Sequence, residues 1–117
     1  MKKIYHLSSC STCKRILNEL EPSSAYILQD IKQDAITEEQ LHEMRELAGS
    51  YEDLFSKRAQ LYKDKDLKNE DLDEDNYRNL ILEHYTFLKR PVIINNDKIF
   101  IGNSKSTVEA AKKAMNE

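Results

Sequence analysis

The sequence predicts an α/β protein in which helices flank a mixed four-stranded β-sheet. Two observations support this fold class. Short apolar runs near both ends of the chain are typical of buried strands, and apolar residues at helical spacing separate them. A long central stretch with helical spacing, at about residues 37–86, interrupts the strand pattern and predicts a helical insert.

The N-terminal part is predicted to form a strand–helix–strand unit. The run Ile4–Leu7 favours a buried strand, and apolar residues at helical spacing predict a helix from Ser11 to about Leu20. Residues 25–29 are the second strand candidate. A strand, a helix and a strand in so short a segment indicate a right-handed parallel crossover.

The insert at about 37–86 is predicted to be helical. A capping box begins at Thr37, and the helix that it starts should stop at Gly49. The dense mixed-charge stretch 63–76 contains no Gly or Pro, so we expect short helices and exposed loop there. Helical spacing returns over residues 77–85.

The C-terminal part is predicted to form a hairpin and a last helix. Residues 92–94 favour a buried strand, 95–97 a turn and 98–101 the partner strand, and Ser104 can cap the final helix. The whole order is βαβ, a helical insert and then ββα. This order is thioredoxin-like, and we expect one domain over residues 1–117.

The chemistry is expected at Cys10 and Cys13. Cys10 lies at the mouth of the predicted helix and Cys13 one turn inside it, on nearly the same face. Free N–H groups and the helix dipole favour an anion at a helix start, which lowers a thiol pKa. The spacing therefore predicts redox-active thiols, with Cys10 as the nucleophile and Cys13 close enough to attack an adduct on it.

The composition argues against several other kinds of function. The net charge of −3 gives no electrostatic case for nonspecific binding to nucleic acid or membranes. Zinc usually takes four ligands, and the two cysteines and the scattered His6, His42 and His84 do not supply a second ligand pair. We expect no metal and no bound cofactor. With no signal-peptide core and no secreted disulfide pattern, a cytoplasmic location is expected.

Three features together resemble the arsenate reductase (ArsC) family, which includes redox regulators of the Spx type. The run Ile4–His6 is followed by Cys10 four residues after the histidine. The helical insert separates the two strand-containing parts. Arg90 and Pro91 precede an apolar strand. The resemblance spans nearly the whole chain and implies the thioredoxin-like fold.

The resemblance implies roles for individual residues. Cys10 corresponds to the nucleophile that attacks arsenate, and Arg90 to an arginine that helps to hold the oxyanion. Pro91 corresponds to a cis proline that faces the cysteine, and His6 to a histidine that favours the thiolate. Taken by themselves, Arg90 could be a surface charge and His6 a packed strand residue, although their chemistry suits anion binding and thiol tuning.

The chain departs from arsenate-reducing members at two positions. Their further arginines would fall near Ser56 and near Gly102. Arg58 could replace the first as a substrate contact, and only Lys105 could approach the second. Because a multiply charged oxyanion is normally held by several donors, these departures weaken the case for arsenate and leave the thiol chemistry intact.

Two functions follow from the pattern and the resemblance. The first is a thiol oxidoreductase that acts on an oxyanion or a disulfide and is resolved by Cys13 or by an external thiol such as glutathione, with glutaredoxin or thioredoxin as partner. The alternative is an Spx-like regulator that binds the RNA polymerase α-subunit and uses the cysteine pair as a redox switch. Gly49 and Arg58 fall near the positions that such regulators use for docking.

Overall fold

A computed structural model describes all 117 residues of the chain. With η marking short 3₁₀ helices, the elements in order are β1 Lys2–His6, α1 Ser11–Leu20, β2 Ile27–Asp30, α2 Glu38–Ala48, η1 Glu52–Leu54, α3 Gln60–Asp64, η2 Leu67–Asn69, α4 Glu74–Glu83, η3 Tyr85–Phe87, β3 Val92–Asn95, β4 Lys98–Ile101 and α5 Lys105–Met115. The chain divides into two compact units. The first comprises Met1–Ala35 and Arg90–Glu117, and the second comprises Ile36–Lys89.

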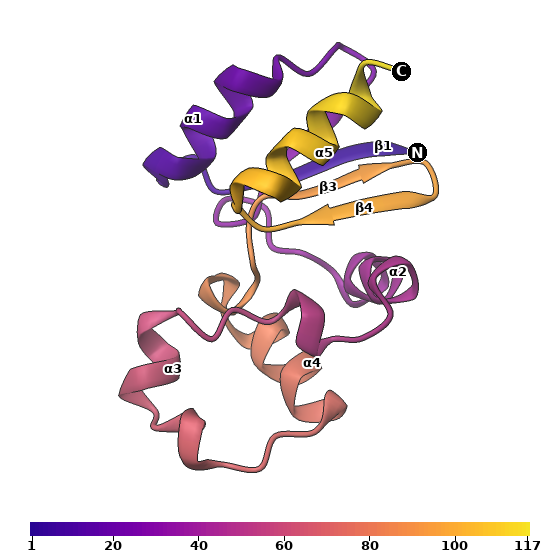
Figure 1. Cartoon of the computed structure of the whole chain (residues 1–117). Coiled ribbons are helices and arrows are strands. Elements are labelled where there is room, and N and C mark those ends of the chain that lie inside the picture. Colours follow the sequence, from indigo (N-terminus) through magenta and orange to yellow (C-terminus); the bar gives the residue numbers. More distant parts are fainter. The chain divides into compact units, whose positions relative to one another are not determined.

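All strands belong to one sheet in the first unit. Its order is β2-β1-β3-β4, with β1 parallel to β2 and antiparallel to β3, and β3 antiparallel to β4. Helices α1 and α5 lie side by side on one face of this sheet (Figure 1). The predicted fold class, a mixed four-stranded sheet flanked by helices, is therefore confirmed.

The core of the first unit lies between the sheet and these two helices. Ile4 of β1 and Ile93 of β3 are direct neighbours across the strands, and both are buried. They pack in one cluster with Ile16 of α1 and with Val108 and Ala111 of α5. Since apolar burial of this kind is the main force that docks a helix on a sheet, it fixes the place of α1 and of its first turn.

The strand–helix–strand unit has the predicted elements with shifted strand ends. Helix α1 spans the predicted residues. Strand β1 is shifted toward the N-terminus and covers 2–6 instead of 4–7, and β2 is shifted toward the C-terminus and covers 27–30 instead of 25–29. Leu7 and Tyr26 lie outside the strands and are nevertheless buried. Apolar runs mark what is buried, and burial continues past the last ladder hydrogen bond.

Helix α2 of the second unit is built as its sequence predicts. The Thr37 side chain accepts from the Gln40 N–H at 3.0 Å, and the Gln40 side chain accepts from the Thr37 N–H at 3.1 Å. Gly49 ends the helix with φ of 101°, a left-handed conformation that suits glycine. The capping box and the glycine stop are both confirmed.

An aromatic cluster forms the core of the second unit. The Phe55 ring stacks on Phe87 with 5.3 Å between centroids, and it meets Tyr77 at 4.9 Å and Tyr62 at 5.9 Å. These rings come from segments on both sides of the charged stretch 63–76. That stretch forms the end of α3, η2 and exposed loop, as expected, and then the start of α4.

Helix α4 is shorter than its apolar spacing predicts. The spacing continues to Tyr85, but the helix ends at Glu83 and His84 is extended, with φ of −150° and ψ of 130°. The His84 Nδ1 atom accepts from the Thr86 N–H at 3.0 Å and so caps η3. A side chain that bonds the following backbone competes with the next helical turn, which explains the early stop.

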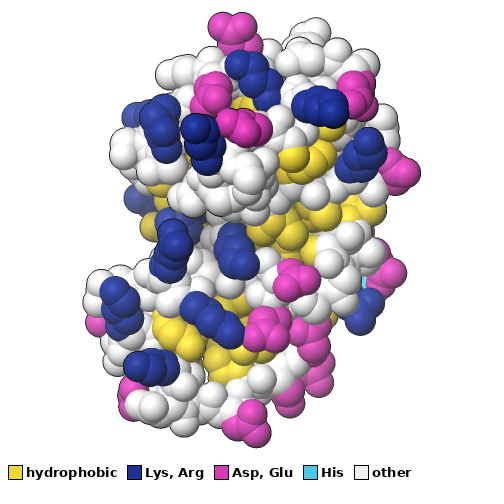
Figure 2. All heavy atoms as spheres, in the orientation of Figure 1, with side chains coloured by type: hydrophobic (Ala, Val, Ile, Leu, Met, Phe, Trp, Pro, Cys, Tyr) yellow, Lys and Arg dark blue, Asp and Glu magenta, His cyan; other side chains and the backbone are white.

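Charged side chains cover much of the surface. Figure 2 shows Lys and Arg side chains interspersed with Asp and Glu on the visible face, in keeping with the net charge of −3. None of the helices combines the length and the apolar character that crossing a membrane requires.

Candidate functional site

Cys10 is the N-cap residue of α1. Its backbone is extended, with φ of −92° and ψ of 117°, and its carbonyl accepts the first helical hydrogen bond from the Lys14 N–H at 3.1 Å. A turn from Leu7 leads into it and is closed by the Cys10 N–H, which donates to the Leu7 carbonyl at 3.0 Å. The thiol is therefore half-buried where β1 passes into α1.

The surroundings of Cys10 favour its charged form. Burial raises the pKa of Cys10, but the backbone N–H groups of Cys13 and Thr12, the Cys13 thiol and the Arg90 guanidinium together hold it below the ordinary value of 9.0. The geometry falls short of a full capping hydrogen bond to the neutral thiol. The N–H groups are nevertheless close enough to stabilise a negative sulfur, as expected at a helix start.

Cys13 has the opposite character. It lies one turn into α1 with only 1% of its surface exposed. Its pKa is raised to about 11, mainly by burial and also by the charge and hydrogen bond of Cys10, while the Leu7 N–H and the charge of Arg90 oppose this rise in part. Both cysteines are free thiols in this structure, so Cys10 ionises first and Cys13 stays protonated beside it.

Arg90 lies near the two thiols, and Pro91 follows it in the chain. The peptide bond between them is cis, as the resemblance implied, and it directly precedes β3, the neighbour of β1 in the sheet. From this position the Arg90 charge acts on both thiols. The Pro91 carbonyl accepts from the Gly102 N–H at 2.9 Å, which ties the loop to the end of β4.

Gly102, near which the second family arginine would fall, has a backbone conformation that disfavours side chains. Its φ of 92° lies in the left-handed region that L side chains rarely adopt. An arginine at this position would be strained in this backbone conformation, although a Cβ would meet no neighbouring atom. Lys105, the sequence-based substitute, is the exposed first residue of α5.

His6 lies at the end of β1 beside an aspartate that the sequence did not single out. The parallel register places it opposite Asp30, the last residue of β2. The Asp30 carboxylate accepts from the Ser8 hydroxyl and from the Lys32 N–H at 3.1 Å. Only the strand register brings Asp30 to the turn before Cys10, so composition and spacing gave no signal for it.

The structure thus brings Cys10, Cys13 and Arg90 together in the first unit, with Pro91 next to them. Arg58 belongs to the second unit, where it is exposed in the turn before α3, and its role as a substrate contact stays a prediction. The thiol-tuning role of His6 also stays a prediction. No three His, Cys, Asp or Glu side chains are grouped so that they could hold a metal.

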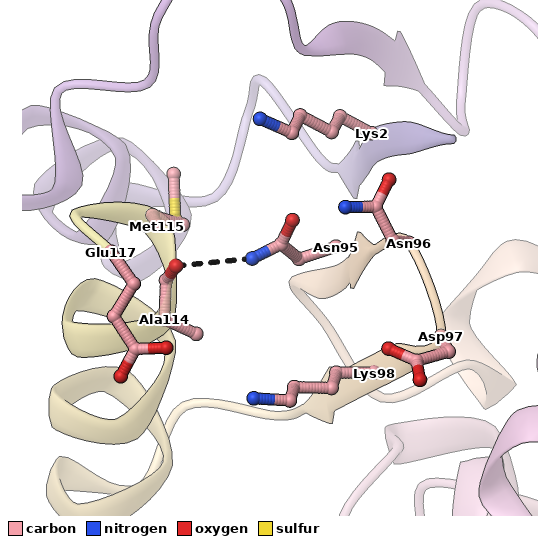
Figure 3. Close-up of a pocket in the computed structure, with 8 residues that line it drawn as sticks. All are labelled: Lys2, Asn95, Asn96, Asp97, Lys98, Ala114, Met115 and Glu117. Carbon is pink, nitrogen blue, oxygen red and sulfur yellow. Dashed lines mark hydrogen bonds between the residues drawn. The ribbon is translucent and has the colours of Figure 1, made fainter.

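A polar pocket lies at the other end of the sheet. It has a volume of about 250 Å³ and lies where β1 begins, β3 ends and α5 ends, whereas Cys10 follows the end of β1 (Figure 3). Inside it the Asn95 side chain donates to the Ala114 carbonyl at 3.1 Å. Its lining is Lys2, Asn95, Asn96, Asp97, Lys98, Ala114, Met115 and Glu117.

Comparison with known proteins identifies a family and agrees with the fold. The ArsC family model matches residues 5–111. The chain is 30% identical to an arsenate reductase of Haemophilus influenzae over 108 residues, which cover 90% of this chain and 93% of that protein. It is 25% identical to the global transcriptional regulator Spx 2 of Bacillus cereus over 108 residues, covering 90% of this chain and 82% of the regulator.

A solved structure extends the likeness to three dimensions. The arsenate reductase from Vibrio cholerae superposes with a TM-score of 0.76 and covers 93% of this chain and 95% of its own, at 21% identity. At that identity the likeness establishes the fold alone.

Proposed function

Because this chain belongs to the ArsC family, we propose that it is a thiol-dependent oxidoreductase whose reacting group is the Cys10 thiolate. One observation carries the proposal. Two sulfurs one helical turn apart have opposite pKa shifts, with the pKa of Cys10 below 9.0 and that of Cys13 raised to about 11. This difference makes Cys10 the nucleophile and leaves Cys13 as a protonated thiol that can attack in a later step.

The first step is attack by the Cys10 thiolate. On a disulfide substrate, the Cys10 sulfur bonds to one substrate sulfur, the substrate S–S bond breaks, and the second substrate sulfur leaves as a thiolate. On arsenate, the sulfur bonds to arsenic and an arsenate oxygen leaves as water after protonation. Arg90 lies close enough to act electrostatically on the thiols, and its guanidinium suits the negative oxygens of an oxyanion.

The second step releases the product and uses Cys13 or an external thiol. With a disulfide substrate, Cys13 loses its proton and attacks the Cys10 sulfur, which frees the bound thiol and leaves a Cys10–Cys13 disulfide. With arsenate, arsenic(V) gains two electrons and leaves as arsenite, while Cys10 and the resolving thiol become a disulfide. Two glutathione thiols, with glutaredoxin, or the dithiol of reduced thioredoxin then reduce this disulfide; Cys10 returns to the thiol, and glutathione disulfide or oxidised thioredoxin is formed.

Formation of an adduct on the Cys10 sulfur should itself make Cys13 easier to ionise. The negative charge of Cys10 and its hydrogen bond both raise the pKa of Cys13, after burial. Once Cys10 carries an adduct, that charge is gone, and the pKa of Cys13 falls toward the range in which a thiolate can form. The order of the two steps therefore follows from the charge of the first sulfur.

Other parts of the proposal rest on composition and family. We propose a cytoplasmic location because free thiols of this kind persist in a reducing compartment. No bound metal or organic cofactor is needed for the steps above. Arg58 is proposed as a second contact for a negative substrate, and His6 as a residue that favours the thiolate.

A turnover assay tests the proposed function. Wild-type protein, Cys10→Ser and Cys13→Ser are compared on arsenate and on a glutathione mixed disulfide, with glutathione and glutaredoxin supplied. We expect turnover by the wild type, none by Cys10→Ser, and turnover by Cys13→Ser only when glutathione can resolve the adduct. Equal rates for wild type and Cys10→Ser on both substrates would refute the proposal.

A second function is supported by the likeness to Spx 2 together with the paired cysteines. In this function the chain would bind the RNA polymerase α-subunit, and a Cys10–Cys13 disulfide would switch the binding. A pull-down with the C-terminal domain of that subunit tests it. Binding that changes between the reduced and oxidised chain would support the regulator, and no binding in either form would exclude it.

A further inference from the structure

The turn that leads into Cys10 is tied to the end of β2. The Ser8 hydroxyl donates to the Asp30 carboxylate, which also accepts from the Lys32 N–H at 3.1 Å. Ser8 lies within the turn that the Leu7–Cys10 backbone hydrogen bond closes. The position of Ser8 therefore affects how the backbone enters Cys10.

Asp30 is itself held by the backbone around it. It pairs with His6 in the parallel register of β1 and β2, and the next residue, Ile31, donates its N–H to the His6 carbonyl at 2.9 Å. The Asp30 carbonyl accepts from the Asp34 N–H at 2.8 Å. A strand end fixed in this way can present a carboxylate to a neighbouring turn with little freedom to move.

We infer that Asp30 is a positioning residue for Cys10 and acts through its hydrogen bond with Ser8. The inference rests on the proposed role of Cys10 as the nucleophile. By holding Ser8, Asp30 keeps the Cys10 backbone where the N–H groups of Thr12 and Cys13 meet its sulfur. The carboxylate charge by itself disfavours a nearby thiolate, so any benefit must come from the hydrogen bond.

The protonation state of Asp30 suits this role. The hydrogen bond from the Ser8 hydroxyl is the largest cause that lowers the pKa of Asp30; burial opposes it, and the N–H groups of Lys32 and Ser8 and the charge of His6 lower it further. The carboxylate therefore remains an acceptor for the Ser8 hydroxyl across the pH range in which Cys10 titrates.

The decisive variant is Ser8→Ala, which removes the hydroxyl hydrogen bond to Asp30 and leaves every charge and every backbone group in place. Ser9→Ala is the matched control, because Ser9 lies in the same turn and is exposed as Ser8 is. The readout is the alkylation rate of Cys10 against pH, followed by mass spectrometry of the Cys10 peptide. We expect Ser8→Ala to raise the pKa of Cys10 and slow alkylation at neutral pH by about threefold, and Ser9→Ala to change neither.

A second background separates the hydrogen bond from the charge. In Asp30→Ala protein, Ser8→Ala should have no further effect, because its partner is already gone. Asp30→Asn keeps an acceptor oxygen for Ser8, so the pKa of Cys10 should not rise above that of the wild type. A thermal melt of each variant checks that the fold is unchanged.

Three outcomes would overturn the inference. One is a Ser8→Ala protein whose Cys10 alkylation profile against pH equals that of the wild type. Another is a Ser8→Ala change that shifts the pKa of Cys10 by the same amount in the wild-type and the Asp30→Ala background. In both of these cases a reactive wild-type Cys10 would leave the proposed function standing. The third is an inert wild-type Cys10, which would overturn the proposed function and the inference together.

Discussion

Helices α1 and α5 pack on the same face of the sheet, yet they begin in different ways. The N-cap residue of α5 is Ser104, whose hydroxyl accepts from the Thr107 N–H at 3.2 Å. The N-cap residue of α1 is Cys10, whose neutral side chain makes no such bond. The same backbone position therefore adds stability in α5, whereas in α1 it leaves N–H groups available to a charged sulfur.

The largest expected effect comes from replacing Cys10, the N-cap residue of α1. Cys10→Ser gives α1 the kind of cap that α5 has, so the fold should be retained while the nucleophile is lost. Turnover should fall on the order of a thousandfold or more, measured in the assay with glutathione and glutaredoxin. The melting temperature should not fall. A variant that unfolds would show instead that Cys10 is needed for structure.

The second effect contrasts the two sulfurs within α1. The pKa of Cys10 lies below 9.0 and that of Cys13 is about 11. At neutral pH their thiolate fractions should differ by at least about a hundredfold, because each pKa unit is a factor of ten. Quantitative alkylation with peptide mass spectrometry should find label on Cys10 well before Cys13. Equal labelling of the two in folded protein would contradict the assignment.

The third effect concerns the charge beside the thiols. Arg90→Ala should reduce turnover of a negatively charged substrate about tenfold and raise the pKa of Cys10 slightly, since Arg90 is the least of the causes that lower it. Arg90→Lys keeps the charge and should restore the pKa but only part of the turnover. If Arg90→Ala and Arg90→Lys lowered turnover by the same factor and shifted the pKa of Cys10 equally, the cause would be disturbed packing and not the lost charge.

The fourth effect is a dependence of stability on pH. The pKa of Cys13 is raised in the folded chain, so the unfolded chain ionises first and stability is lost as pH rises from 9.0 toward about 11. One unit above 9.0, the loss from Cys13 is about 1.4 kcal/mol in the free energy of unfolding.

Denaturant melts of wild type and Cys13→Ala across this range measure that loss. The variant starts from a lower stability because it leaves a small cavity, so the slopes are compared and not the absolute values. We expect a shallower decline for Cys13→Ala. Parallel slopes would mean that Cys13 titrates normally in the folded chain.

The smallest expected effect comes from replacing Ser104, the N-cap residue of α5. Ser104→Ala removes a capping hydrogen bond and should cost about 1 kcal/mol in the free energy of unfolding. The pH profile of Cys10 should not change, because Ser104 serves stability alone. A shift in that profile would mean that the two helix starts are coupled.

Local patterns predicted the elements and the core of the site. The range of α1, the capping box at Thr37 and the glycine stop at Gly49 each depend on a few consecutive residues, and all three are confirmed. The placement of Cys10 and Cys13 follows from helix geometry in the same way. Such features are readable because their physical causes lie within one or two turns of the chain.

Features that depend on distant contacts were missed. Asp30 reaches the turn before Cys10 only through the parallel register of β2 and β1. The early end of α4 was missed for a different reason: its cause, the hydrogen bond from the Thr86 N–H to the His84 side chain, is local, but apolar spacing does not report side-chain hydrogen bonds. Arg58 remains a prediction because its role depends on contacts across the chain. The spacing of residues along the chain does not predict which distant residues meet in the fold.

The most direct test is a titration of both sulfurs by NMR, using protein with isotope-labelled cysteine. The chemical shift of each Cβ reports the ionisation of its own thiol. We predict a midpoint below 9.0 for Cys10 and a separate midpoint near 11 for Cys13. A Cys10 midpoint at or above 9.0, or a single shared transition, would contradict the assignment of Cys10 as the reacting thiolate.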